Sequence, residues 1–326
     1  MALHTPAELL ALVNSSIERL SLDKKPFRLY EPVKYTLSMG GKRIRPVMCL
    51  MACDMFGGDV QKAIPAALAL EIFHNFTLLH DDIMDKAEKR RNMDCVHIRW
   101  NDNVAILSGD AMQIIAFDML KELPDPIFRE SVGIFSKTAL EVCEGQQFDM
   151  DFETQENVCE AEYMEMIRLK TAVLLAASLK LGAVVGNAPS TQAGLLYDFG
   201  IHIGLAFQLQ DDLLDVYGDP KTFGKNIGGD ITTNKKTYLL IQALKRADAT
   251  SREQLERWLA LKDFQPDEKI KAVTAIFDQT KVKDNCQQEI ERHYNMALEC
   301  LKATQTEIDR KEPLMKLAAG LMYRTF

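Results

Sequence analysis

Apolar residues recur along this chain with the three- and four-residue spacing of a helix, almost from end to end. The first helix is predicted to begin at a capping box, Thr5-Pro6-Ala7-Glu8, ahead of a periodic apolar run that ends at Leu20. Alternating patterns that would predict strands are essentially missing. The pattern therefore predicts an all-α protein. The other predicted helices cover about 26–39, 46–56, 60–85, 103–122, 126–151, 161–186, 190–216, 233–247, 251–261, 267–280, 284–308 and 313–323.

Local signals refine some of these bounds and leave the chain in one piece. Pro32 lies inside the second predicted helix, which is best defined after that proline because proline removes a backbone donor. A second capping box, Ser251-Arg252-Glu253-Gln254, predicts a helix start at residue 251. No fixed-period repeat, low-complexity tract or Pro/Ser-rich linker interrupts the sequence. We therefore expect one all-helical domain spanning residues 1–326.

Composition narrows the classes of function. With 326 residues, 47% of them apolar, the chain can bury a substantial core, and its net charge of −8 argues against a general nucleic-acid binder. The N-terminus lacks a basic segment followed by an apolar run, and no apolar stretch approaches the roughly 18 residues of a membrane span. We therefore expect neither a secretory signal nor a span. Seven dispersed cysteines without a Cys-x-x-Cys pair favour reduced thiols and a cytoplasmic location.

Two copies of one acidic pattern lie inside apolar, helix-compatible sequence: Asp81-Asp82-Ile83-Met84-Asp85 and Asp211-Asp212-Leu213-Leu214-Asp215. Unpaired buried carboxylates are costly, so something must neutralise them. On a helix, residues i and i+4 share a face, and each triplet presents a cluster of oxygens. Such clusters suit Mg²⁺, which takes substrate phosphates as further ligands. His74 lies seven residues before Asp81, on nearly the same face of its helix.

Basic residues lie after both acidic patterns and in a turn before one of the predicted helices. Lys42, Arg43 and Arg45 lie in a glycine-bounded turn before a helix, and Arg90-Arg91 follow the first acidic pattern. Lys170-Thr171 interrupt an apolar helix, and Lys225 and Lys235-Lys236 flank a glycine loop after the second acidic pattern. Any one of these, Arg45 and Lys236 above all, is compatible with a solvated surface charge. Carboxylate clusters combined with dispersed cations in an anionic protein indicate polyphosphate held through Mg²⁺.

Over nearly its whole length the chain resembles the trans-type isoprenyl diphosphate synthases, the polyprenyl synthetase family. The family's Asp-Asp-x-x-Asp with a downstream Arg-Arg is met by residues 81–85 and 90–91, and its second acidic motif by Phe207–Asp215. Gly40–Pro46 matches a Gly-Gly-Lys-Arg-x-Arg-Pro signature. Glu71-Ile72-Phe73-His74, Lys170-Thr171 and Gly228-Gly229-Asp230 match as well. Asn92 departs from the pattern, which has glycine after the paired arginines.

The resemblance implies a fold, a reaction and a set of roles. It implies a bundle of antiparallel helices around a central cavity, a homodimer, and three Mg²⁺ ions per active site when diphosphate is bound. An allylic diphosphate (dimethylallyl, geranyl or farnesyl) ionises, isopentenyl diphosphate attacks the cation, and the released diphosphate takes the proton.

The implied direct metal ligands are Asp81, Asp85 and Asp211, with Asp82, Asp212 and Asp215 supporting them or bound through water. The implied allylic diphosphate ligands are Arg90, Lys170, Lys225 and Lys235; those of isopentenyl diphosphate are Lys42, Arg43, His74 and Arg91. Thr171 and Gln208 are implied to place oxygen dipoles beside the cation.

Product length is expected to follow the depth of the pocket below the first acidic motif. The residues four and five positions before Asp81 are Thr77 and Phe76, about 6–7.5 Å further down the helix, or roughly one prenyl unit. One aromatic residue there, with no insertion in the motif, resembles short-chain synthases that stop at C20 or C15, and we expect C20. Simple core packing of Phe76 is the alternative.

Three other functions remain to be distinguished. A class I terpene cyclase carries one such acidic motif but usually an Asn/Ser/Glu-type second metal site, and head-to-head squalene or phytoene synthases carry sparser acidic motifs. A non-catalytic subunit of a heteromeric synthase commonly loses acidic-motif residues, whereas all six aspartates are present here. The second acidic motif and the Lys42, Arg43 and His74 set favour the prenyltransferase.

Overall fold

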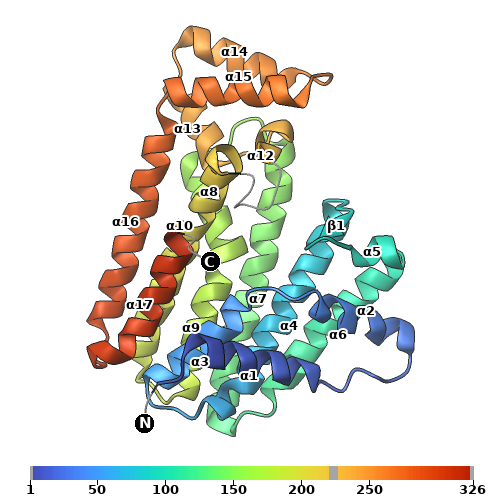
Figure 1. Ribbon diagram of the computed structural model, residues 1–326, viewed down its shortest axis with the longest axis vertical. Helices are drawn as coiled ribbons and strands as arrows, with labels where there is room; N and C mark the ends of the chain where they lie inside the picture. The colour runs from blue at the N-terminus through green and yellow to red at the C-terminus, as the bar shows by residue number, and fades with distance from the viewer. Residues whose placement is uncertain (1–2, 220–226, 324–326) are drawn as a thin grey trace. The chain divides into compact units, whose positions relative to one another are not determined.

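The computed structural model describes residues 3–219 and 227–323 (Figure 1). Within these ranges the regular structure is helical apart from one hairpin of two-residue strands, which confirms the predicted all-α class. The elements are α1 Pro6–Glu18, α2 Phe27–Ser38, α3 Ile44–Met55, α4 Val60–Met84, β1 Lys89–Arg90, β2 Met93–Asp94, α5 Val96–Arg99, α6 Asp102–Leu120, α7 Asp125–Thr154, α8 Glu160–Ile167, the π-helix η1 Arg168–Ala172, α9 Val173–Val185, α10 Ser190–Tyr217, α12 Gly229–Thr232, α13 Tyr238–Arg246, α14 Ala249–Ala260, α15 Pro266–Gln279, α16 Val282–Ala303 and α17 Ile308–Tyr323.

The chain divides into two compact units. Unit 1 comprises Met1–Lys137, Ala177–Tyr197 and Ala303–Met315, and unit 2 comprises Thr138–Ala176, Asp198–Lys302 and Lys316–Phe326. The first acidic motif belongs to unit 1 and the second to unit 2. The organisation as one domain over residues 1–326 stays a prediction.

The core of unit 1 is built around α3, which is buried on every side. All residues from Pro46 to Met55 are buried, as expected for a helix that is apolar all round. Gly182 of α9 lies directly against α3, because a Cβ added to it would meet the carbonyl oxygen of Cys49 at 1.9 Å. Only a residue without a side chain permits the two helices to approach this closely.

Helices α4 and α6 of unit 1 lie side by side (Figure 1). Gly109 of α6 faces His80 of α4, whose ring nitrogen Nε2 lies 3.2 Å from the carbonyl oxygen of Ile106. Among the described residues, α6 is also the one helix long and apolar enough to cross a membrane by length and composition, with 33% of the relevant window buried. Buried helices of soluble proteins meet the same criterion, and the absence of a membrane span stays a prediction.

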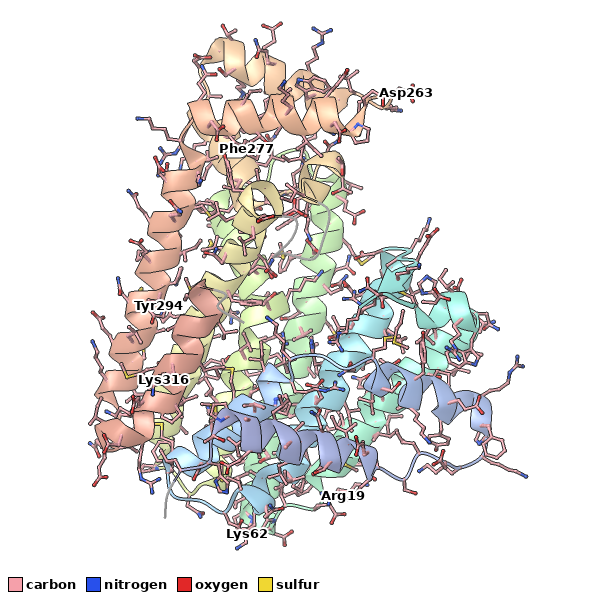
Figure 2. The ribbon with its side chains drawn as sticks, viewed as in Figure 1. Arg19, Lys62, Asp263, Phe277, Tyr294 and Lys316 are labelled. Carbon is pink, nitrogen blue, oxygen red and sulfur yellow. The ribbon has the colours of Figure 1, made fainter. Side chains whose placement is uncertain are left out.

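Unit 2 has a core of its own, formed where α8, α10, α13, α15 and α16 meet. Phe277 of α15, labelled in Figure 2, is 2% exposed and packs in this cluster with Leu255 of α14 and Ile290 of α16. Surface side chains such as Asp263, also labelled there, lie outside the core. Helices α14 and α15 lie side by side (Figure 1).

Several predicted helix bounds needed correction. The capping box predicted at Ser251 is wrong: α14 begins at Ala249 because Asp248 caps it, accepting the backbone N–H of Ser251 at 2.7 Å. Helix α2 also covers the residues before Pro32, and α17 begins five residues before Pro313. The capping box of Thr5 and Glu8 is confirmed.

The longest discrepancy is a π-helix inside the predicted helix 161–186. The turn Arg168–Ala172 follows α8 and leads into α9, and it contains Lys170 and Thr171. Gly145 of α7 lies against the backbone of this turn, since a Cβ there would meet the nitrogen of Lys170 at 2.3 Å. Single π-turns inside α-helices are frequent at functional sites.

Candidate active site

The first acidic motif ends α4, and an arginine from the following hairpin joins two of its carboxylates. Nε of Arg90 donates to Oδ1 of Asp82 at 2.7 Å, and its Nη2 reaches Oδ2 of Asp81 at 3.4 Å. The side chain of Asp82 is 6% exposed and that of Asp81 is 19% exposed. Asp85 is the exposed C-cap of the helix. Asp82 is therefore turned towards the protein, Asp81 is partly exposed and Asp85 is exposed.

The hairpin that carries Arg90 explains the unusual asparagine at position 92. Arg90 pairs with Met93, so that Arg91 and Asn92 form a two-residue loop. Both have positive φ, 52° and 63° respectively, as a type I′ turn requires. Asparagine is among the few residues that adopt this conformation readily. The departure from the family's glycine therefore keeps the loop geometry.

Arg91 projects from this loop over the glycine turn between α2 and α3. Its guanidinium donates to the carbonyl oxygen of Gly40. A Cβ on Gly41 would lie 2.8 Å from the guanidinium carbon, and Gly41 has a φ of 127°. The backbone conformation at position 41 therefore requires glycine, and the guanidinium of Arg91 lies against it.

Of the two arginines in the turn, Arg43 is buried and paired with groups of the protein. It is 6% exposed, its Nη1 lies 2.5 Å from Oε1 of Glu71, and its Nη2 donates to the carbonyl oxygen of Leu37 at 2.5 Å. Nδ2 of Asn75 donates to the same carboxylate oxygen at 2.8 Å. The predicted contact of Arg43 with diphosphate stays a prediction, and in this structure the side chain holds the turn on α4.

Arg45, which the sequence left compatible with a solvated surface charge, is the arginine that reaches His74. Its Nη1 lies 3.1 Å from Nε2 of His74, and its buried Nε has no hydrogen-bond partner among the described residues. Burial, then the charges of Arg45 and Arg91, lower the pKa of His74 well below its usual value. The imidazole is therefore neutral and accepts from Arg45. The spacing of Arg45, three residues after Lys42, was the available signal.

In unit 2, Asp212 is buried in a set of donors. Its carboxylate accepts the hydroxyl of Tyr163 and, at 3.2 Å, Nε2 of Gln208. Oε1 of Gln208 accepts the hydroxyl of Thr171 at 3.0 Å. Burial raises the pKa of Asp212, and these donors oppose the rise. The structure thus brings together Thr171, Gln208 and Asp212, and it adds Tyr163.

Asp215 holds the backbone of the Gly-Gly-Asp segment. Its Oδ2 accepts the N–H of Asp230 at 3.0 Å, and its carbonyl oxygen accepts the N–H of Gly228 at 2.7 Å. Asp230 was matched to the family but not selected as a site residue. The contact with Asp215 fixes its position.

Lys170 and Lys235, both predicted to bind the allylic diphosphate, meet at one carboxylate. Nζ of Lys170 lies 2.6 Å from Oδ2 of Asp149 in α7, and Nζ of Lys235 lies 3.8 Å from the same oxygen. Burial raises the pKa of Asp149, but the two lysines outweigh it and hold the pKa below its usual range. Sequence reasoning missed Asp149. Lys225, the third predicted lysine, lies outside the described residues.

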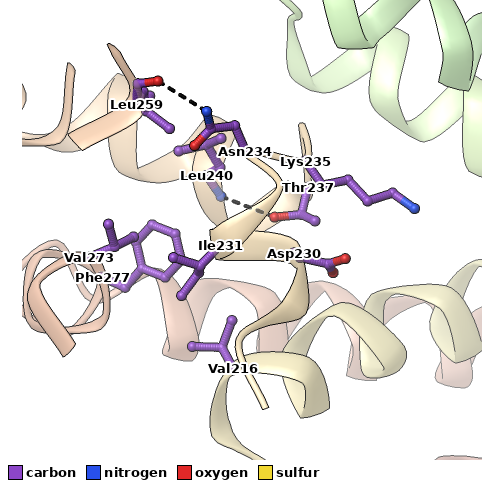
Figure 3. Close-up of a pocket in the computed structure, with 10 residues that line it drawn as sticks. All are labelled: Val216, Asp230, Ile231, Asn234, Lys235, Thr237, Leu240, Leu259, Val273 and Phe277. Atoms are coloured by element: carbon purple, nitrogen blue, oxygen red, sulfur yellow. Dashed lines mark hydrogen bonds between the residues drawn. The ribbon is translucent and has the colours of Figure 1, made fainter. Parts of the chain in front are cut away.

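A small cavity backs the segment that carries Asp230 and Lys235 (Figure 3). Its volume of about 10 Å³ has room for about one water molecule. In Figure 3, Asp230 and Lys235 point away from the apolar side of the cavity, where Phe277 lies. Asn234 donates to the carbonyl oxygen of Leu259 at 3.0 Å. The cavity is too small for a substrate, so we interpret this region as support for the segment.

The oxygen donors present fit Mg²⁺. Within the part of the chain that the structure describes, no three His, Cys, Asp or Glu side chains form a ready-made metal cage. Such cages are not what Mg²⁺ requires, because it is usually bound by one or two carboxylates together with substrate phosphates. Asp81 and Asp211 are partly exposed aspartates of this kind. The metal roles of all six motif aspartates stay predictions.

Comparisons with known proteins agree on one family. The polyprenyl synthetase family is matched over residues 26–277. A geranylgeranyl diphosphate synthase of Methanosarcina mazei is 41% identical over 236 residues, covering 72% of this chain and 73% of the relative. A crystal structure of a geranylgeranyl pyrophosphate synthase superposes with a TM-score of 0.94 at 41% identity, over 98% of this chain and 99% of that chain. A geranylgeranyl pyrophosphate synthase from Corynebacterium glutamicum, complexed with isoprenyl diphosphate and magnesium, has a TM-score of 0.85 at 26% identity, over 99% and 100%.

Proposed function

The chain belongs to the polyprenyl synthetase family, and we propose that it condenses isopentenyl diphosphate with an allylic diphosphate, head to tail and in the trans configuration. It is a trans-prenyltransferase of the short-chain type. The observation that best supports a reaction of two substrates is a group of basic residues, Arg45 and Arg91, beside the neutral His74. This group is separate from the acidic motif that would hold metal, so it can bind a second diphosphate.

The residues divide the chemistry of the reaction between them. Asp81, Asp85 and Asp211 would hold Mg²⁺, which when bound neutralises the charge of the departing diphosphate. Lys170 and Lys235 share one carboxylate, Asp149, so the three groups carry a net positive charge towards an incoming anion. Isopentenyl diphosphate is bound by Lys42, Arg45, His74 and Arg91, while Arg43 holds the turn. Lys225 is assigned to the allylic diphosphate from its sequence position alone.

The test is a direct assay. Purified protein is incubated with isopentenyl diphosphate, Mg²⁺ and each of the dimethylallyl, geranyl and farnesyl diphosphates, and the products are sized. We expect a prenyl diphosphate extended by five-carbon units. A cyclic or unphosphorylated hydrocarbon would indicate a terpene cyclase, and no condensation with any primer would indicate a non-catalytic subunit.

Replacing Arg45 by glutamine should weaken isopentenyl diphosphate binding in particular. The loss of one charge-assisted contact is worth about 1.5–3 kcal/mol, or roughly 10- to 100-fold in KM for that substrate. The KM for the allylic substrate should change little. Steady-state kinetics with one substrate varied at a time measure both constants. Arg252→Gln, an exposed arginine paired within its own helix, is the control, and equal effects on both substrates would contradict the assignment.

Replacing Phe76 by alanine should lengthen the product. Phe76 is 7% exposed and its ring centroid lies 4.7 Å from that of His80 and 5.4 Å from that of Phe73. We expect this ring to be the floor of the product pocket below the first acidic motif. Its removal should extend that pocket by roughly one prenyl unit, about 7.5 Å along the helix. Chain lengths are read by chromatography of the hydrolysed products. Phe27→Ala removes an exposed ring of the same size as the control, and an unchanged product spectrum for Phe76→Ala would assign Phe76 to core packing.

We infer that the wild-type product is mainly C20. The inference is supported by the single aromatic residue at position 76 and by the similarity to proteins named geranylgeranyl diphosphate synthases. C15 remains the second candidate, and the same product sizing distinguishes them.

We also propose that the protein is a cytoplasmic homodimer. Ile106, Leu107 and Ile114 of α6 are 43%, 60% and 70% exposed, an apolar face that a second copy would cover. All seven cysteines are free, as expected in a reducing compartment. Light scattering of the purified protein measures the mass; a monomer at micromolar concentration would contradict the dimer.

A further inference from the structure

A chain of hydrogen bonds in unit 2 begins at a tyrosine that belongs to none of the motifs described above. Tyr163 of α8 is 2% exposed, and its hydroxyl donates to Oδ2 of Asp212. Oδ1 of Asp212 accepts from Nε2 of Gln208, and Oε1 of Gln208 accepts from the hydroxyl of Thr171. Four side chains from α8, the π-helix and α10 therefore form one continuous path.

The carboxylate at the centre fixes the direction of every hydrogen bond in this path. An ionised Asp212 only accepts, so Gln208 must turn its amide nitrogen towards it. The oxygen of Gln208 then faces Thr171, whose hydroxyl must donate. The one hydroxyl hydrogen of Thr171 is thereby used, and only its lone pairs remain for a group in front of it.

We propose that Tyr163 is a positioning residue for prenyl transfer, which acts through Asp212 and Gln208 to hold Thr171 as an acceptor facing the allylic cation. The inference rests on the proposed function, because it needs a cation at that place. Oxygen lone pairs aimed at developing positive charge stabilise it, whereas a hydroxyl hydrogen in the same place would not.

Donors from three elements restrain the carboxylate of Asp212: the phenol of Tyr163, the amide of Gln208 and the backbone N–H of Tyr238 at the start of α13. The phenol binds one oxygen from α8 and Gln208 binds the other from within α10. Without the phenol, a buried carboxylate loses a partner and can rotate away from Gln208. Both oxygens serve protein donors, and this also favours a supporting role for Asp212 over direct metal binding.

The test is Tyr163→Phe, which removes the hydroxyl and keeps the ring. We expect kcat to fall about tenfold, equivalent to about 1.4 kcal/mol, while KM for both substrates stays within about twofold. Tyr217→Phe is the matched control. It removes a tyrosine hydroxyl that donates to Asp278 at 2.9 Å, near the end of α10 and away from this path, and should leave kcat unchanged.

A double-mutant cycle separates positioning from simple stabilisation. In the background of Thr171→Val, which has no hydroxyl to orient, Tyr163→Phe should lower kcat less than about twofold further. Additive losses, or an unchanged kcat in Tyr163→Phe, would overturn the inference. The melting temperature of the metal-free protein is measured alongside, and a loss of activity that follows it would also count against positioning.

Two other results need their own interpretation: a Tyr163→Phe variant that does not fold, and a wild-type protein that does not react. Should Tyr163→Phe fail to fold, Gln208→Glu removes the donor to Asp212 without disturbing a ring, and it should lower kcat with KM retained. An unchanged kcat in Gln208→Glu would then overturn the inference. Failure of the wild-type protein to condense any primer would reject the proposed function instead, so the two failures are distinguishable.

Discussion

Asp81→Asn should lower kcat about 1,000-fold or more, because the substitution replaces a charged oxygen ligand by a neutral amide where diphosphate charge develops. Asp81 is the partly exposed carboxylate of the pair that Arg90 joins, and its backbone carbonyl accepts the N–H of Asp85. The side-chain change is isosteric and leaves that backbone contact in place. The protein should therefore fold normally while losing activity.

Kinetics at several Mg²⁺ concentrations and a thermal unfolding curve measure the two properties separately. Excess Mg²⁺ should restore only part of the activity, since the lost ligand also orients the ion. Asp118→Asn is the control and should retain full activity, because Asp118 is exposed and pairs with Lys121, the C-cap residue of α6. A kcat for Asp81→Asn within about tenfold of wild type would exclude Asp81 as a metal ligand.

Gly182→Ala should be the most destabilising small substitution in unit 1. The added Cβ would lie 1.9 Å from the carbonyl oxygen of Cys49 and 3.0 Å from the Cβ of Ala52. Because the first contact is with backbone, no side-chain rotation relieves it, and α3 and α9 must separate. Overpacking of this kind costs about 3 kcal/mol or more, against the small gain in helix propensity that alanine brings.

Urea unfolding curves of the wild type and the variant measure the change in the free energy of unfolding. Gly194→Ala is the matched control: it is also a helical glycine, but nothing lies within 4 Å of its added Cβ. That substitution should raise stability by up to about 1 kcal/mol. Equal midpoints for the two alanine variants would show that α3 and α9 do not pack as described.

Local patterns were enough to place most helices and both acidic motifs. Helical periodicity and the Thr5 cap depend on neighbours within a turn or two, which the sequence contains. The bounds failed where two local signals compete. Asp248 and Ser251 are both good N-caps, and only the backbone shows which one accepts the hydrogen bond.

The division of roles among like residues depended on the tertiary structure. Arg43 and Arg45 are two residues apart and chemically identical, yet Glu71, 28 residues after Arg43, neutralises Arg43 and leaves Arg45 to meet His74. The same holds for Asp149, whose place between Lys170 and Lys235 brings together three separate elements.

The sequence by itself determined the helical class, the family and the oxygen and cation chemistry of the site, because residue type and helical spacing are local properties. The tertiary structure decided which charged side chains pair with other groups of the protein and which are left to bind ligands. Asp212 and Arg43 are turned inwards onto partners 49 and 28 residues away, and Asp82 onto Arg90 of the following hairpin. A buried charge must find its partner wherever the fold brings one within hydrogen-bonding distance, and spacing along the chain does not contain that distance.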